Sequence, residues 1–197
     1  MIINPNKIAR SFDFFGNIAL VKFSTQMAAK DKKHFADRLL KDNRSIKTVL
    51  EKIGGFKGRL RKQATKHIAG LKTKEALYRE NGCVFRFNID SVYFSPRLSN
   101  ERKEIASKIR KGERVLVMFA GVGPYSIVSA KNSKADKVVS VEINREASRY
   151  AKMNVELNGV KGKVEIIQGD VKRIVKKLKT KFDVIVMPRP QLKYSFL

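Results

Sequence analysis

Short apolar runs alternate with predicted helices throughout the second half of the chain. The apolar runs have the length of strands and occupy residues 114–119, 137–141, 164–168 and 182–187. The predicted helices between them occupy residues 125–132, 144–157 and 171–178. One helix has good end signals, because Asn144 is a preferred N-cap and Asn158-Gly159 a preferred stop. This alternation predicts an α/β domain built on a parallel sheet with right-handed crossovers.

The first half of the chain has a less regular pattern. Strand character occurs in residues 16–23, 46–50 and 84–89. Ser24 or Thr25 can cap a helix that runs to about Leu40, and Gly54-Gly55 is expected to end the second strand. Residues 56–69 look irregular and basic. A small α+β module is therefore expected here.

The two patterns predict two domains, an α+β domain over residues 1–95 and an α/β domain over residues 96–197. The last predicted strand, at 182–187, lies close to the end of the sequence. A complete sheet of this kind needs further strands, so its last strand would lack a neighbour. We therefore expect either a fragment, truncated after its fourth strand, or a protein partner or second chain that completes the sheet.

Charge is the abnormal feature of the composition. The 43 Lys and Arg residues exceed the 18 Asp and Glu residues, which gives a formal net charge of +25. Residues 1–96 contribute 20 − 8 = +12 and residues 97–197 contribute 23 − 10 = +13, so the excess is spread over the folded body. A polyanionic partner usually compensates such self-repulsion. Nucleic acid is favoured over a membrane surface, because no basic amphipathic helix with a broad apolar face is present.

Other residue types limit the chemistry and the location. Cys83 is the single cysteine, which excludes an internal disulfide and a cysteine zinc site, and His34 and His67 are the only histidines. No metal site is expected. The longest uncharged run, residues 115–130, is shorter than the roughly 20 residues that span a bilayer, and no signal peptide opens the chain. We therefore expect a soluble cytoplasmic protein without membrane contact.

The ends of the predicted parallel strands carry the candidate chemistry, because ligands bind at that edge of such a sheet. The first strand ends in a turn where Gly121 and Gly123 allow close backbone approach. Glu142 ends the second strand, 19 residues after Gly123, at the position of a carboxylate that holds ribose hydroxyls. Asp170 ends the third and can accept a hydrogen bond from an adenine amino group, and the fourth leads into Pro188-Arg189-Pro190.

A dinucleotide is the rival ligand for this glycine turn. Its fingerprint needs a third glycine where this chain has Ser126, and Pro124 removes an amide that a phosphate would use. S-adenosylmethionine carries no phosphate and tolerates both departures. It is therefore the favoured cofactor, and a nicotinamide-dependent enzyme is the weaker alternative.

Several strings give the chain a family resemblance. They are Ser11-Phe12-Asp13, Gly16-Asn17-Ile18-Ala19, Lys47-Thr48-Val49-Leu50, Arg59-Leu60-Arg61, Glu80-Asn81-Gly82, the run YFSPRLSNER at 93–102 and the run MFAGVGP at 118–124. By these strings, residues 11–197 resemble the archaeal and eukaryal tRNA guanosine-37 N1-methyltransferases, specifically the archaeal branch linked to wyosine synthesis, whose C7-methyltransferases act on 4-demethylwyosine-37 in tRNA. The resemblance implies a Rossmann-like class I methyltransferase sheet preceded by a small α+β RNA-binding domain.

The resemblance also implies roles for single residues. Glu101 matches a general base that takes the proton from guanine N1, and Arg61 and Arg97 match arginines that orient the base and stabilise charge on its O6. Residues expected at the cofactor are Arg102, Phe119, Gly121, Gly123, Glu142, Ile143, Asp170 and Val171. Residues expected at the RNA substrate are Arg59, Asn81, Pro188 and Pro190. Independently of the resemblance, Glu101 and Arg102 could simply begin a helix capped by Ser99 or Asn100, where an acid is favourable.

Two departures from the family pattern affect the expected substrate. Val117 replaces the acid that usually precedes the glycine turn, and Pro188-Arg189-Pro190 replaces an Asn-x-Pro segment. The latter variant resembles the wyosine branch, so the tricyclic base at position 37 is the expected substrate, with guanosine a second one. Relatives carry an additional N-terminal domain that touches the tRNA elbow, and its absence would leave recognition to the anticodon stem-loop. A catalytically impaired RNA-binding remnant, or a methyltransferase for another RNA site, is the alternative.

Overall fold

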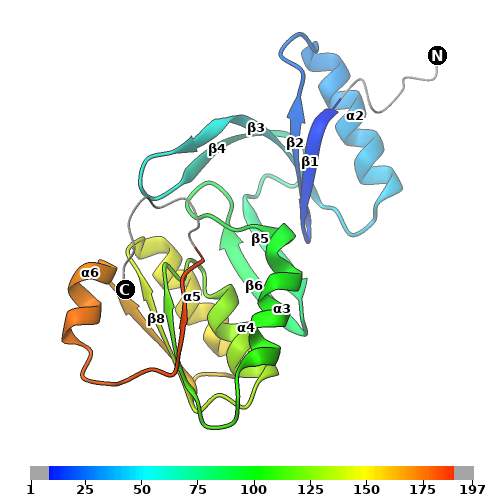
Figure 1. Cartoon of the computed structure of the whole chain (residues 1–197). Helices are drawn as coiled ribbons and strands as arrows, with labels where there is room; N and C mark the ends of the chain where they lie inside the picture. Colours follow the sequence, from blue (N-terminus) through cyan, green and yellow to red (C-terminus); the bar gives the residue numbers. More distant parts are fainter. Residues whose placement is uncertain (1–8, 189–197) are drawn as a thin grey trace.

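The first part of the chain folds as a four-stranded sheet with one helix (Figure 1). The structure is a computed structural model that describes residues 9–188. The elements of this part are β1 (Ala9–Phe15), β2 (Ile18–Phe23), α2 (Ala29–Asp42), β3 (Thr48–Lys57) and β4 (Lys62–Gly70). The strand order follows the chain, and β2 and β3 are parallel because α2 connects them.

The apolar run of β2 supplies two cores at once, because successive strand residues face opposite sides of a sheet. Ala19 and Val21 are fully buried in a cluster with Ala36 of α2. Ile18 and Leu20 belong to the larger cluster that extends into the rest of the molecule. One face of the first sheet is therefore covered by α2. Its other face packs on the second part of the chain, residues 75–188.

The second sheet is entirely parallel, as the sequence predicted. Its strands are β7 (Arg114–Met118), β8 (Lys137–Glu142), β9 (Val164–Gln168) and β10 (Val184–Val186). They lie in the order β10-β7-β8-β9. The chain therefore adds β8 and β9 on one side of β7 and then returns to add β10 on the other side. The crevice at such a switch point is where ligands bind in open α/β sheets.

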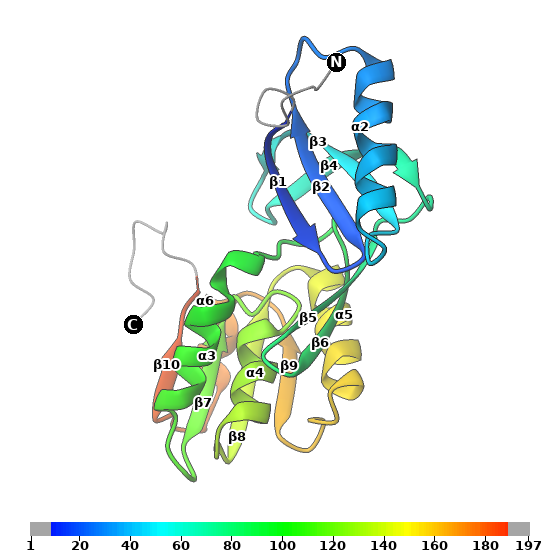
Figure 2. The same cartoon turned by 90° about the vertical axis from the view of Figure 1, so that its right-hand side faces the viewer.

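Helices cover both faces of this sheet (Figure 2). They are η1 (Pro96–Leu98), α3 (Ser99–Lys108), α4 (Pro124–Asn132), α5 (Arg145–Leu157), α6 (Val171–Ile174) and η2 (Val175–Lys177). Val115 and Val117 of β7 face the cluster that includes α3, α4 and α5, whereas Leu116 and Met118 face the cluster that includes α6. Burial on both faces explains why this strand is a continuous apolar run.

A hairpin of β5 (Glu75–Glu80) and β6 (Cys83–Asn88) joins the two sheets. Its turn residues Asn81 and Gly82 have positive φ angles of 48° and 71°, which a two-residue hairpin turn requires. The free edge of β6 is satisfied by α5, because the side-chain amides of Asn154 and Asn158 each exchange hydrogen bonds with its backbone. On the other side, Leu77 of β5 donates its N–H to Asn17 Oδ1 at 2.7 Å, which fixes the hairpin to the turn between β1 and β2.

Several local predictions for the first half were wrong. β1 and β5 were not predicted, and the segment at 56–69, expected to be irregular, contains most of β4. In β4 the inward positions are polar, since Gln63 and Thr65 are buried between exposed Lys62 and Lys66, so its alternation lacks the apolar signal of a strand. β3 likewise continues through Gly54-Gly55, which was expected to end it.

The helix ends also differ from prediction. The N-cap of α2 is Ala28 with no side-chain cap, rather than Ser24 or Thr25. The N-cap of α3 is Leu98, rather than Ser99 or Asn100, because the short helix η1 leads directly into it. By contrast, Asn144 caps α5 as predicted, accepting from two backbone N–H groups.

No helix in the described range is sufficiently long and apolar to cross a membrane. The predicted division between the domains after residue 95 remains a prediction. Burial of Phe85 and Phe87 of β6 in the same cluster as Val115 ties the hairpin closely to the second sheet.

Candidate active site

The ends of β7, β8 and β9 meet at Glu142, as the sequence predicted. One oxygen of its buried carboxylate accepts the Gly121 N–H at 2.8 Å, and the other accepts the Asn144 N–H at 2.7 Å. Its backbone carbonyl accepts the N–H of Gly169, the residue before Asp170, at 2.8 Å. The glycine turn, Glu142 and Asp170 therefore lie at one rim of the sheet.

The glycine turn needs unusual backbone angles. Phe119, Gly121 and Gly123 all have positive φ, of 58°, 58° and 85°. This conformation is costly for Phe119, and such residues cluster at functional sites. Gly123 also has a packing reason, because a Cβ there would lie 3.2 Å from the Ile127 side chain.

A pocket opens at this rim, with about 530 Å³ of empty space that includes part of the open solvent. Residues from both parts of the chain line it. Those expected from the sequence are Arg59, Arg61, Phe119, Gly121, Glu142, Ile143 and Pro188. Those not singled out from the sequence are Leu60, Tyr93, Asn144 and Ala147. Tyr93 starts the string that contains Glu101, and Asn144 and Ala147 follow Glu142, so proximity in sequence was an available signal.

The residues present fit a nucleoside-type cofactor. Each Glu142 oxygen accepts one backbone hydrogen bond and keeps a further lone pair for a ribose hydroxyl. Among residues 9–188, a Cβ on Gly121 would have one neighbour within 4 Å, the Tyr93 carbonyl at 3.7 Å, so these residues leave open space beside the turn. Phe119 and Ile143 provide apolar surface for a flat ring.

The tip of the β3–β4 hairpin brings the first part of the chain to the pocket (Figure 1). There the Arg61 guanidinium lies 3.9 Å from the centre of the Tyr93 ring and 5.2 Å from that of Phe56. The two rings contact each other edge to face at 5.1 Å. Cation–π contacts therefore hold the positive charge of Arg61 at the pocket wall.

Arg59, at the same tip, forms an ion pair with Asp170 across the rim. Its Nη2 lies 2.5 Å from Asp170 Oδ2, while Asp170 Oδ1 accepts the Lys172 N–H at 2.9 Å and caps α6. The hydrogen bond from Arg59, followed by that from the Lys172 backbone, lowers the pKa of the Asp170 carboxyl. Asp170 itself is not part of the pocket lining, so its predicted contact with adenine stays a prediction.

A tyrosine links Glu101 to the glycine turn. The Tyr125 hydroxyl, one residue after Pro124, donates a short hydrogen bond to Glu101 Oε1. Burial of the ring, and then this bond, raise the pKa of Tyr125 strongly, so the hydroxyl keeps its proton. Glu101 is exposed at the start of α3, which leaves its carboxylate accessible to a substrate.

Arg102 is completely buried in an ion pair. Its Nε and Nη2 bind the two oxygens of Glu80 at 2.5 and 2.6 Å, and Nη2 also donates to the Ser95 carbonyl at 3.0 Å. These contacts fix β5 and the segment before η1 to α3. Arg102 does not line the pocket, and its predicted contact with the cofactor stays a prediction.

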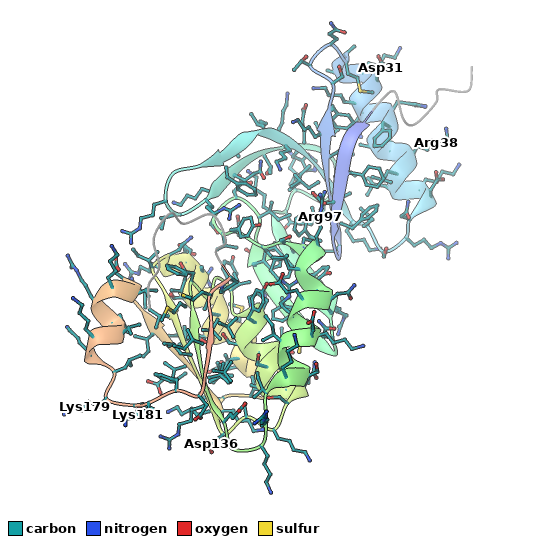
Figure 3. The ribbon with its side chains drawn as sticks, in the orientation of Figure 1. Asp31, Arg38, Arg97, Asp136, Lys179 and Lys181 are labelled. Atoms are coloured by element: carbon teal, nitrogen blue, oxygen red, sulfur yellow. The ribbon has the colours of Figure 1, made fainter. Side chains whose placement is uncertain are left out.

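Glu101, Gly123 and the remaining predicted residues within the described part of the chain also lie outside the pocket lining. Arg97 is exposed and binds Asp13 of β1 at 2.7 Å, which raises its pKa (Figure 3). Asn81 donates to Ser99 and accepts from Asn132, and Val171, the first residue of α6, is buried in the cluster with Leu116 and Val139, so both have structural partners. Pro190 lies outside the described residues. Within residues 9–188 no group of three or more His, Cys, Asp or Glu could hold a metal ion.

A doubly wound parallel sheet with a glycine turn and a ribose-type glutamate at its switch point defines a Rossmann-like domain of the methyltransferase type. The chain belongs to the TRM5/TYW2 family of methyltransferases. The family model described as the TRM5/TYW2 methyltransferase domain matches residues 76–197, and the model described as the TYW2 N-terminal domain matches residues 4–73. The predicted resemblance to this family is thus confirmed for both halves of the chain.

Relatives and solved structures agree with this membership. The chain is 36% identical over all its length to the tRNA (guanine(37)-N(1))-methyltransferase Trm5b of Pyrococcus abyssi, of which it covers 58%. It is 37% identical over 76% of its length to the tRNA (guanine(37)-N(1))/4-demethylwyosine(37)-methyltransferase Taw22 of Nanoarchaeum equitans, of which it covers 49%. A solved complex of aTrm5 with tRNALeu superposes on 94% of this chain and 54% of that chain, with TM-score 0.82 and 31% identity. The chain thus spans about half the length of these relatives.

Proposed function

We propose that this chain forms the cofactor- and base-binding part of a tRNA methyltransferase that modifies position 37, next to the anticodon. The methyl group comes from S-adenosylmethionine, and the acceptor is C7 of the wyosine precursor, N1 of guanosine, or both. The observation that carries the proposal is the pocket at the sheet rim. It combines Glu142 and the glycine turn with Arg61 from the other part of the chain.

S-adenosylmethionine supplies an electrophilic methyl group when it is bound. Glu142, Phe119 and Ile143 are the residues that hold it, through ribose hydroxyls and apolar contact. The opposite wall of the pocket, formed by the hairpin tip and Tyr93, faces the target base. Cofactor and base thereby meet in one cleft, which supplies the orientation that methyl transfer requires.

Glu101 and Arg61 activate the base in this proposal. Guanine N1 is a poor nucleophile until it loses its proton, and the exposed Glu101 carboxylate accepts that proton. Arg61 supplies positive charge to the O6 that becomes negative. Arg97 assists in positioning, since it lies at the interface of β1 and η1.

The choice of base depends on the wall that contains Pro188. The family pattern has Asn-x-Pro in this segment, whereas this chain has Pro188-Arg189-Pro190, and Pro188 lines the pocket. A proline offers no amide to a guanine edge and gives a flat apolar surface that suits a tricyclic base. We therefore propose the wyosine precursor as the preferred substrate, with Arg59, Asn81 and Pro190 as further RNA contacts.

Mass spectrometry of nucleosides tests the proposal. The protein is incubated with labelled S-adenosylmethionine and with tRNA that carries either guanosine or 4-demethylwyosine at position 37. We expect label at position 37, and more of it on the tricyclic base. Label at another position would favour a different RNA site, and binding of tRNA without any label would favour the RNA-binding remnant.

Three further expectations belong to this proposal. Within the described part of the chain no strand pairs with the outer edge of β10, and Ile185 of that strand is 43% exposed. A further segment or a second chain is therefore proposed to complete the sheet there. The anticodon stem-loop is the proposed partner in RNA, and the cytoplasm is the proposed place of action.

A further inference from the structure

The segment of residues 171–182, which starts with α6, is amphipathic, and all the charged side chains on its exposed side are basic. Its apolar residues Val171, Ile174, Val175 and Leu178 all pack on the sheet in the cluster that contains Leu116 and Val139. Its six basic residues are all exposed, and they are Lys172, Arg173, Lys176, Lys177, Lys179 and Lys181. We call these six residues the basic strip.

The basic strip has no acidic residue of its own, because no Asp or Glu lies between Asp170 and Asp183. The other exposed helices neutralise part of their charge internally. Lys33 pairs with Asp37 in α2, Lys108 with Glu104 in α3, and Arg149 with Glu146 in α5. The strip is therefore a local concentration of positive charge, and its self-repulsion favours an external anion.

The strip begins at the pocket rim. Asp170, which caps α6, is bound to Arg59 of the hairpin tip, and Arg59 lines the pocket. From there the strip leads away from the first part of the chain, and Lys179 and Lys181 lie at its outer end (Figure 3). Positive charge thus continues from the pocket along one side of the second sheet.

We propose that the basic strip binds the phosphate backbone of the RNA stem adjoining the target base. This inference rests on the proposed function and adds the surface that holds the RNA outside the pocket. A stem whose nearest base enters the pocket lies beside the rim where the strip begins, and the exposed lysines of the strip contact its phosphates one by one. The strip supplies affinity without reading sequence.

A membrane surface fits the strip less well. Binding to a lipid interface buries an apolar face of several residues together with the charges. Here the apolar face is already occupied by the sheet, so only charged groups remain for a partner. A phosphate backbone needs no more than that.

Salt dependence of binding tests the proposal. The first variant combines Lys176→Gln, Lys177→Gln, Lys179→Gln and Lys181→Gln. The control removes the same charge from exposed positions of α2, with Lys30→Gln, Lys33→Gln, Arg38→Gln and Lys41→Gln. The affinity for tRNA is measured between about 50 and 200 mM salt.

We expect the slope of log K against log salt to fall by about one unit per lost phosphate contact, hence by two or more in the strip variant. The control should change by less than one unit, and both variants should bind S-adenosylmethionine like the wild type. Equal slopes in strip variant and wild type, or equal losses in strip variant and control, would overturn the proposal. So would loss of binding to phosphatidylserine vesicles with tRNA binding unchanged.

Binding measurements on the wild type distinguish failure of this inference from failure of the proposed function. A wild-type chain that binds neither S-adenosylmethionine nor tRNA overturns both. If the wild type binds both and the strip variant has the same slope of log K against log salt, only the inference about the basic strip is overturned. Thermal unfolding of each variant checks that the exposed substitutions leave the fold intact.

Discussion

Tyr125 shows how a single side chain links the glycine turn to the proposed general base. Its ring is 4% exposed, at the start of α4, and its hydroxyl donates to the exposed Glu101. The bond restricts the Glu101 side chain to one position, which the sequence alone did not indicate.

Replacing Tyr125 by phenylalanine removes only this hydrogen bond. Without the donor the Glu101 carboxylate is no longer held in one position, so we expect kcat to fall by about tenfold. The KM for tRNA should stay the same. The matched control is Tyr150→Phe, which removes a hydroxyl bound to Glu75 and should leave kcat unchanged. An unchanged kcat in the Tyr125 variant would show that Tyr125 does not position Glu101 for the reaction.

The buried pair of Arg102 and Glu80 is a second feature of single residues. Both side chains are at most 2% exposed, so Glu80→Ala leaves an uncompensated charge in the interior. We expect a loss of about 3–5 kcal/mol in the free energy of unfolding, measured by urea denaturation. Glu104→Ala, which breaks the exposed pair with Lys108, should have no measurable effect. A small loss for Glu80→Ala would mean that solvent reaches Arg102.

At the scale of elements, the sequence correctly predicted the strands and the helix whose buried residues recur with the period of that element. The four strands of the parallel sheet and helix α5 with its cap Asn144 all lie where expected. Prediction failed for β4, whose inward Gln63 and Thr65 are polar, and for β5, which alternates only weakly. The hairpin tip between β3 and β4 was therefore missed, although its residues Arg59 and Arg61 were identified by resemblance. The contact of that tip with the rim depends on tertiary packing, which no local pattern reveals.

The ion pair between the hairpin tip and α6 has a measurable consequence. Arg59 is the main cause of the lowered pKa of Asp170, so Arg59→Ala should raise that pKa toward its ordinary value. The carboxylate carbon signal of Asp170, followed by NMR through an acid titration, measures the change. Because the folded-state pKa is depressed, the pair contributes stability at neutral pH, which is lost as the pH falls through that pKa. Arg44→Ala, an exposed arginine beyond the end of α2, is the control and should leave the titration of Asp170 unchanged.

At the scale of the whole molecule, two parts of the chain build one pocket. The second sheet supplies the rim with Glu142, and the first sheet supplies the hairpin tip with Arg61. Asn17 and Arg97 fix the two parts to each other, through Leu77 of β5 and Asp13 of β1. The rim was predictable because strand ends are ordered by topology. The opposite wall was not, because Tyr93 and Leu60 reach it only through the packing of one sheet on the other.

Calorimetric titration with S-adenosylmethionine tests the central claim most directly. The 197-residue chain should bind one equivalent, and Glu142→Ala should weaken binding by at least tenfold, because each ribose hydroxyl bond to a carboxylate contributes about 1.5–3 kcal/mol. Glu146→Ala, an exposed acid in the first turn of α5, should bind like the wild type. Absence of heat with the wild type, or equal affinities in all three proteins, would contradict a methyl-donor site at this rim.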